Sequence, residues 1–137
     1  MSNVYFLGVN DTDAKLELFS EVVKYFREYN IMPELQNPDL DMYVKALMLH
    51  SMYSNVAVCR TTDSVAFTVI EEQELNPHVD GSCLILMLTL ATGGTALGKL
   101  LRSVKRLAIA RNHQWLYVSH RVAPCTYQSK YINLRKR

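Results

Sequence analysis

Apolar and polar positions along the chain fall into blocks whose spacing predicts strands and helices in turn. Residues 4–9 form an almost continuous apolar run that ends in polar residues, which predicts a first strand. Over residues 14–29 the apolar positions recur at intervals of three and four, which predicts an amphipathic helix. A second helix is expected to begin at Asn37 and Pro38, a capping residue followed by proline, and to end near residue 54.

The middle of the chain has the pattern of a sheet. Residues 56–59 and 65–70 are β-type runs joined by a short polar connection, which predicts a hairpin of antiparallel strands. Residues 82–90 are nearly all apolar, as expected for a central strand that is covered on both faces. A glycine-rich turn then leads into a third helix, which we expect to stop near residue 112.

The last part of the chain adds shorter elements. Residues 115–118 predict another strand, residues 123–129 predict a short helix opened by Pro124, and the segment from residue 132 is a brief strand or a tail. The expected order is therefore β-α-α-β-β-β-α-β-α, with or without a final β. We expect one domain over residues 1–137, of the α/β (α+β) class, with a mixed, mostly antiparallel central sheet flanked by helices.

Composition narrows the class of protein. Apolar residues make up 49% and charged residues 20% of the 137 positions, as in a folded globular domain. The formal net charge of +2 is too small to indicate a nucleic-acid partner, and the cations of the third helix fit a solvated helix face. No apolar run is long enough to span a bilayer, so no membrane partner is expected. The odd number of cysteines, Cys59, Cys83 and Cys125, without a C-x-x-C pair, favours a reduced cytoplasmic protein with no metal site.

The glycine-rich turn is the segment whose residues indicate a binding site most clearly. Gly93, Gly94, Thr95 and Ala96 follow the apolar strand and open a helix, whose free N–H groups attract phosphate. Lys99 and Arg102 lie one turn further on and could add positive charge to the same ligand. The alternative is a plain strand-to-helix connection that needs glycine for its positive φ angles.

At these residues the chain resembles the GNAT superfamily of acyl-CoA-dependent N-acetyltransferases, whose order of elements is similar over nearly the whole length. The pyrophosphate loop of that family, Q/R-x-x-G-x-G/A, is matched at Gly94 and Ala96, with Ala91 at the opening position. A second family motif, N-x-x-A-x-x-L-Y, is matched at Ala123 and Tyr127.

The resemblance implies a function and a set of site residues. Acetyl-CoA would be the co-substrate, and an amine of a protein or small molecule would be the acceptor. Tyr127 would protonate the leaving thiolate, and the backbone of Leu86 and Leu88 would bind the pantetheine and polarise the thioester carbonyl. The general base would be Glu72 or His120. The groups around the pyrophosphate would be Gly93, Gly94, Thr95, Ala96 and Lys99.

An alternative follows from the half-kept motifs. The chain would then be a catalytically inactive GNAT-like structural or binding protein, for example a phage virion or host-takeover component, and its location would be the virion. Met42, Met48 and Met52 lie on the second predicted helix, where they could form a contact with a second copy or another protein.

Overall fold

The computed structural model describes residues 3–33, 36–123 and 126–135 and arranges them as strands and helices around one sheet. In chain order the elements are β1 (Val4–Leu7), α1 (Thr12–Glu28), α2 (Asn37–Ser51), β2 (Asn55–Arg60), β3 (Val65–Gln73), β4 (Cys83–Ala91), α3 (Ala96–Ala110), β5 (Trp115–Ala123) and β6 (Thr126–Asn133).

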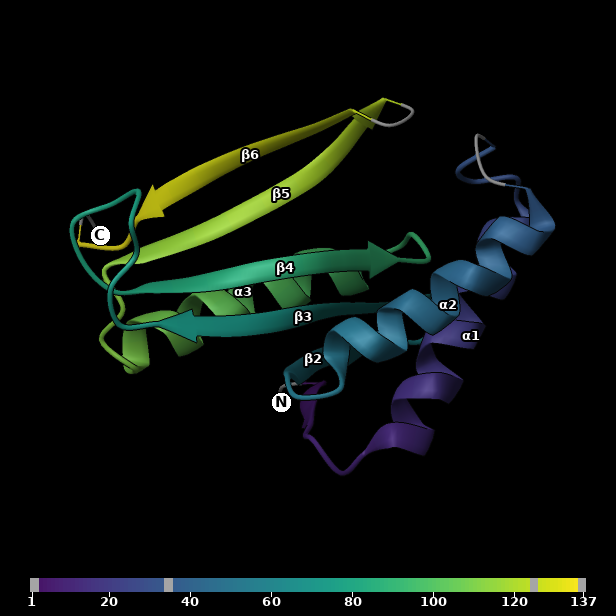
Figure 1. Ribbon diagram of the computed structural model, residues 1–137, viewed down its shortest axis with the longest axis horizontal. Coiled ribbons are helices and arrows are strands. Elements are labelled where there is room, and N and C mark those ends of the chain that lie inside the picture. The colour runs from purple at the N-terminus through teal and green to yellow at the C-terminus, as the bar shows by residue number, and fades with distance from the viewer. Residues whose placement is uncertain (1–2, 34–35, 124–125, 136–137) are drawn as a thin grey trace.

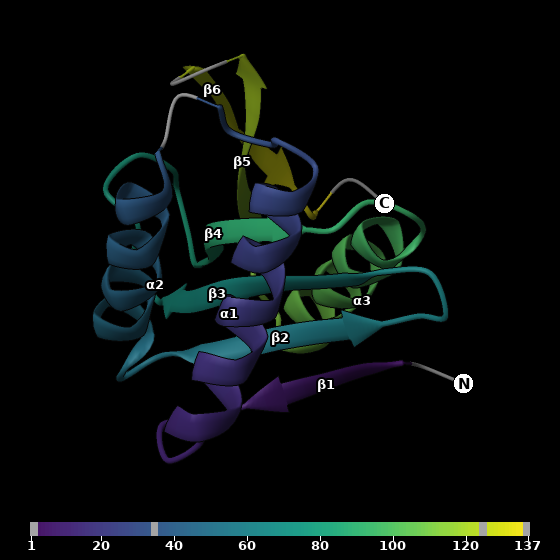
Figure 2. The ribbon, with the colours of Figure 1, turned by 90° about the vertical axis from the view of Figure 1, so that its right-hand side faces the viewer.

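The strands form one six-stranded sheet in the order β1-β2-β3-β4-β5-β6 (Figure 1). All neighbouring strands are antiparallel except β4 and β5, which are parallel and are joined through α3. Helices α1 and α2 cover one face of the sheet and α3 covers the other (Figure 2). The architecture is therefore a mixed α+β layered fold with a mostly antiparallel sheet, as the order of apolar blocks predicted.

Each face of the sheet buries its own apolar cluster. Under α1, Phe19 and Val22 pack with Phe67 and Val69 of β3. Under α3, Leu100 and Val104 pack with Leu84 of β4. The spacing of three or four residues puts these helix side chains on one stripe, so burial of that stripe fixes each helix to its face of the sheet.

A buried lysine joins the two helices of the first face. The side chain of Lys15 in α1 is almost fully buried, and its Nζ donates hydrogen bonds to the carbonyl oxygens of Ser51 (2.9 Å) and Ser54 (3.0 Å). Ser51 is the last residue of α2 and Ser54 lies just beyond it, so the ammonium group lies at the C-terminal end of the helix, where the helix dipole favours a positive charge. Burial lowers the pKa of Lys15, and the charge of Asp11 opposes that effect.

The expected final helix over residues 123–129 is wrong. Here β5 runs on to Ala123, and β6 begins at Thr126 and pairs antiparallel with it. The rings of Tyr117 and Tyr131 face each other across this pair, with centroids 4.7 Å apart. Cross-strand contacts of this kind outweigh the local helix signal. Pro124 and Cys125, on which part of the expectation rested, lie outside the described residues.

Two further findings bear on expectations from composition. Among the helices of the described residues, none is both long enough and apolar enough to cross a lipid bilayer. Cys59 and Cys83 are free thiols, and burial raises the pKa of each.

Candidate functional site

The candidate site begins where β4 and β5 separate. The two strands share three register pairs in the described residues, from Cys83↔Trp115 to Ile85↔Tyr117. Just beyond, the β3–β4 register shifts so that Ile70 faces Leu86 and Val69 faces Leu88, which leaves Met87 as an extra residue on β4. A bulge of this kind bends its strand and increases the local twist. The strands diverge from this point on (Figure 1).

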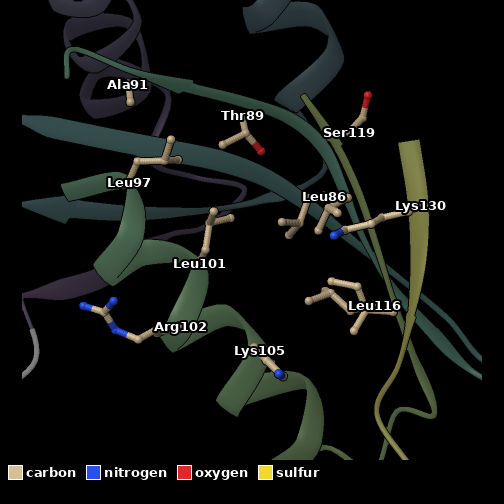
Figure 3. Close-up of a pocket in the computed structure, with 12 residues that line it drawn as sticks. Leu86, Thr89, Ala91, Leu97, Leu101, Arg102, Lys105, Leu116, Ser119 and Lys130 are labelled. Carbon is tan, nitrogen blue, oxygen red and sulfur yellow. The ribbon is translucent and has the colours of Figure 1, made fainter. Parts of the chain in front are cut away.

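The space opened by this divergence is a cavity of about 630 Å³, which we call the slot (Figure 3). Its volume falls in the range of small-molecule sites. Most of its wall is apolar, with side chains from α3 on one side and from β4, β5 and β6 on the other. The apolar residues are Leu86, Ala91, Leu97, Leu101, Leu116, Val118 and Ile132.

Among the described residues, three cations and two hydroxyl groups complete the wall of the slot. The cations are Arg102 and Lys105 of α3 and Lys130 of β6, and the hydroxyls are those of Thr89 and Ser119. In Figure 3, Lys130 extends from β6 toward Leu86, while the guanidinium of Arg102 turns away. The lining of the slot therefore combines apolar walls with positive charge.

A smaller pocket of about 250 Å³ lies on the α2 side of the sheet. It shares Thr89 and Ser119 with the slot, so the two hollows lie next to each other at β4 and β5. Tyr43 of α2 and Tyr127 of β6 also line it. Burial raises the pKa of Tyr43, and the neighbouring Tyr127 adds to that rise. Tyr127 is 55% exposed. The remaining lining residues are Met32, Met87, Leu88 and Leu90.

The backbone at the glycine turn already binds an anion, the side-chain carboxylate of Asp63. One carboxylate oxygen of Asp63, in the β2–β3 connection, accepts hydrogen bonds from the backbone N–H (3.4 Å) and the hydroxyl (3.2 Å) of Thr95. Ser64 Oγ accepts from the N–H of Ala96 at 3.0 Å. Hydrogen bonds from Thr61, Ser64 and Thr95 lower the pKa of Asp63 to about 2. Asp63 is thus a carboxylate at neutral pH and occupies the N-terminal end of α3.

In this arrangement the turn does not fit a diphosphate. Gly93 and Gly94 have φ angles of 97° and 73°, as the connection alternative expected of a tight turn. A Cβ atom added at Gly94 would lie 2.8 Å from Asp63 Cγ, so no free space separates the turn from the carboxylate. A phosphate group would compete with Asp63 for the same N–H donors and would be repelled by its charge. The pyrophosphate role expected of residues 93–96 stays a prediction that requires Asp63 to move.

Lys99 and the two leucines take separate positions. Lys99 does not line the slot, and it is near enough to Cys59 of β2 for its charge to act on that thiol. Leu86 faces the slot, whereas Leu88, on the other side of the bulge, lines the α2-side pocket. The two residues expected to bind one pantetheine chain therefore lie at two different, adjacent hollows.

The general base expected at Glu72 lies far from the glycine turn. Thr92, just before that turn, bonds to Val65, and Glu72 is seven strand positions further along β3, roughly 23 Å away. The carboxylate of Glu72 pairs with Arg111 and accepts a hydrogen bond from His113 Nε2 at 2.7 Å. In this position Glu72 ties the end of α3 to β3. The other candidate base, His120, belongs to β5, but its side chain lies outside the described residues.

Sequence patterns alone do not identify Lys105 and Lys130 as slot residues, or Asp63 as the carboxylate at the glycine turn. The pattern places Lys105 on a solvated helix face and Asp63 in a polar hairpin connection, and it gives Lys130 no role. The sequence does contain a signal for Lys105 and Lys130, namely the absence of acidic residues around them. The four elements around the slot, α3, β4, β5 and β6, contain no Asp or Glu at all.

In the part of the chain that the structure describes, no three His, Cys, Asp or Glu side chains gather closely enough to hold a metal ion. No protein-family model matches the sequence, and a search of the curated proteins finds no match to it.

Proposed function

We propose that the protein is a GNAT-like domain that binds an acyl-CoA in the slot. The observation that carries this proposal is the separation of two parallel strands after three register pairs, with apolar walls and a cationic border. Beyond Ile85, the edge of β4 that faces β5 has no further register pair in the described residues. An extended chain with amide groups, such as pantetheine, can bond to a strand edge in the way another strand does.

Calorimetric titration with acetyl-CoA and with free CoA tests binding. Leu101→Trp places an indole in the slot and should abolish binding, because Leu101 is part of its wall. Leu49→Trp is the matched control, since Leu49 is 71% exposed on α2 and does not line either hollow. Failure of the wild type to bind either ligand at millimolar concentration contradicts the proposal.

The place of the phosphates can be tested separately. Because the Asp63 carboxylate already accepts a hydrogen bond from the backbone at the N-terminal end of α3, we expect the CoA phosphates to bind the cations that line the slot, among them Lys130. Lys130→Met should then weaken CoA binding, and Asp63→Asn should leave it nearly unchanged. A gain in CoA affinity in Asp63→Asn, with no effect of Lys130→Met, would assign the phosphates to the glycine turn instead.

Acyl transfer to an amine is the second function we propose, on the observation that Tyr127 lines the pocket that lies next to the slot. In this reaction the amine nitrogen bonds to the thioester carbonyl carbon and loses a proton to solvent water, the C–S bond breaks, and the leaving thiolate takes a proton. The phenol of Tyr127 is the proposed donor of that proton.

A thiol-release assay with a panel of amines tests transfer. Tyr127→Phe should lower kcat with little change in acetyl-CoA affinity, and Tyr53→Phe, an exposed tyrosine outside both hollows, should not. Binding without thiol release is the result expected of a non-catalytic binding protein. The ion pair of Glu72 with Arg111 favours that alternative, because it engages one of the two expected bases.

A further inference from the structure

We propose that the slot is a binding site for a single-headed amphiphilic anion, a medium-chain fatty acid, whose carboxylate lies at Lys130, with Lys105 adding positive charge to the same slot. Its alkyl chain would lie among the leucines of α3 and β4. This inference goes beyond acyl-CoA binding and does not depend on it, because it requires neither a thioester nor a nucleotide.

The apolar part of the slot fits a flexible alkyl chain. Leu97 and Leu101 form the α3 wall, and Leu86 and Leu116 face them from the sheet (Figure 3). An alkyl chain that enters between these side chains loses its contact with water over most of its length, which is the main driving force for its binding.

The charge around the slot fits one carboxylate. No Asp or Glu occurs in the four elements that wall it. Lys105 and Lys130 form no ion pair with any described residue, whereas Arg27, Arg60 and Arg135 each pair with a carboxylate. Of the cations in the lining, Lys130 extends into the slot (Figure 3). Positive groups without a partner beside apolar walls are complementary to a carboxylate with an alkyl chain.

The glycine turn favours a single-headed ligand over one that carries a diphosphate. Asp63 accepts the Thr95 N–H at the N-terminal end of α3, so side chains must supply the positive charge for a ligand anion. A fatty acid has one anionic group, so contact between its carboxylate and these side chains is sufficient. Its chain also has room in the slot, whose volume is about 630 Å³.

Titration with hexanoate, octanoate and decanoate, followed by calorimetry and by NMR shifts of the slot methyl groups, tests the inference. Affinity should rise about fourfold for each methylene added, the factor that corresponds to about 0.8 kcal/mol. 1-Octanol, which has the same chain as octanoate without the charge, should bind more weakly than octanoate.

Three variants locate the ligand. The double variant Lys105→Met and Lys130→Met should lower octanoate affinity about tenfold and leave 1-octanol affinity unchanged. Lys45→Met, which removes an exposed lysine of α2, should affect neither ligand. Leu101→Trp should abolish binding of both, because it fills the slot.

Absence of octanoate and decanoate binding overturns the inference, and so does binding that does not depend on chain length or on the two lysines. If acetyl-CoA binds and the fatty acids do not, this inference fails while the proposed function stands. If the fatty acids bind in the slot and acetyl-CoA does not bind, the proposed function fails and this inference stands.

Discussion

Asp63 stabilises the start of α3 through its negative charge, and this effect depends on pH. Its pKa is about 2 in the folded protein against an ordinary value of 3.8, because Thr61, Ser64 and Thr95 donate hydrogen bonds to the carboxylate. A carboxyl group whose pKa is lower in the folded state contributes stability above its ordinary pKa and loses it as the pH falls toward the folded value.

Asp63→Asn should therefore lower the melting temperature at neutral pH, and the difference from wild type should shrink between pH 3.8 and about 2. Asp13→Asn removes the same charge from the exposed first turn of α1 and controls for net charge. Thermal unfolding at a series of pH values measures both variants. A difference that stays constant over this interval would show that the carboxylate does not cap α3.

Lys15 is the second residue whose role follows from its contacts. Lys15→Met keeps the buried apolar stem but leaves the carbonyls of Ser51 and Ser54 without their donor. We expect a loss of about 1 to 3 kcal/mol in the free energy of unfolding, measured by urea denaturation. Lys24→Met, at an exposed position of the same helix, should change stability by less than about 0.5 kcal/mol. Equal effects of the two variants would contradict the capping role of Lys15.

Hydrophobic spacing is sufficient to predict the order of the first eight elements, although β5 runs five residues past its expected end at Val118, and the spacing fails at β6. The helices α1 and α3 have long, regular stripes, and β2 to β4 are short apolar runs between polar turns, so local pattern and final structure agree. β6 has eight residues with only moderate apolar content, and its alternation places Lys130 and Ile132 toward the slot. Pairing with β5, a tertiary interaction, decides its structure.

A hydrogen bond between β3 and β4 holds one residue of the slot wall in position, and its contribution to stability can be tested. Thr68 is fully buried, and its hydroxyl shares a 2.8 Å hydrogen bond with Thr89, which lines the slot. Thr68→Val alone leaves Thr89 without this partner and should cost about 1 kcal/mol or more in the free energy of unfolding.

The double variant Thr68→Val with Thr89→Val removes both polar groups and should cost less than the sum of the single changes. Urea denaturation of the four proteins in this cycle gives the coupling. Additive effects would mean that the two hydroxyls do not stabilise one another.

At the scale of the whole molecule, the slot depends on geometry that no local pattern encodes. It requires the extra residue Met87 in β4, the end of β4–β5 pairing at Ile85 and the attachment of β6 to β5. The sequence predicted the central strand and the glycine turn correctly as elements. It could not predict that Asp63, more than thirty residues away, would occupy the turn, because that contact is set by the β2–β3 connection in three dimensions.

The same geometry makes the β5–β6 hairpin the part of the sheet that we expect to open most readily. The end of the hairpin where β5 begins and β6 ends is held by three β4–β5 register pairs and by Arg135. The guanidinium carbon of Arg135 lies 5.2 Å from the Trp115 ring centroid, and its Nη2 donates a hydrogen bond to Asp80 at 3.0 Å. In the described residues, β5 has no register pair with β4 beyond Tyr117, and residues 126–130 of β6 are exposed. Local opening is favoured where few buried contacts oppose it.

Amide hydrogen exchange followed by mass spectrometry measures this opening. We expect amides of residues 118–123 and 126–130 to exchange at least about tenfold faster than those of the buried strand segment 65–70. A ligand that occupies the slot contacts both β4 and β6, so it should slow exchange in the hairpin and leave segment 65–70 unchanged. Uniform protection across the sheet would contradict an independently opening hairpin, and protection that a bound ligand leaves unaltered would place that ligand outside the slot.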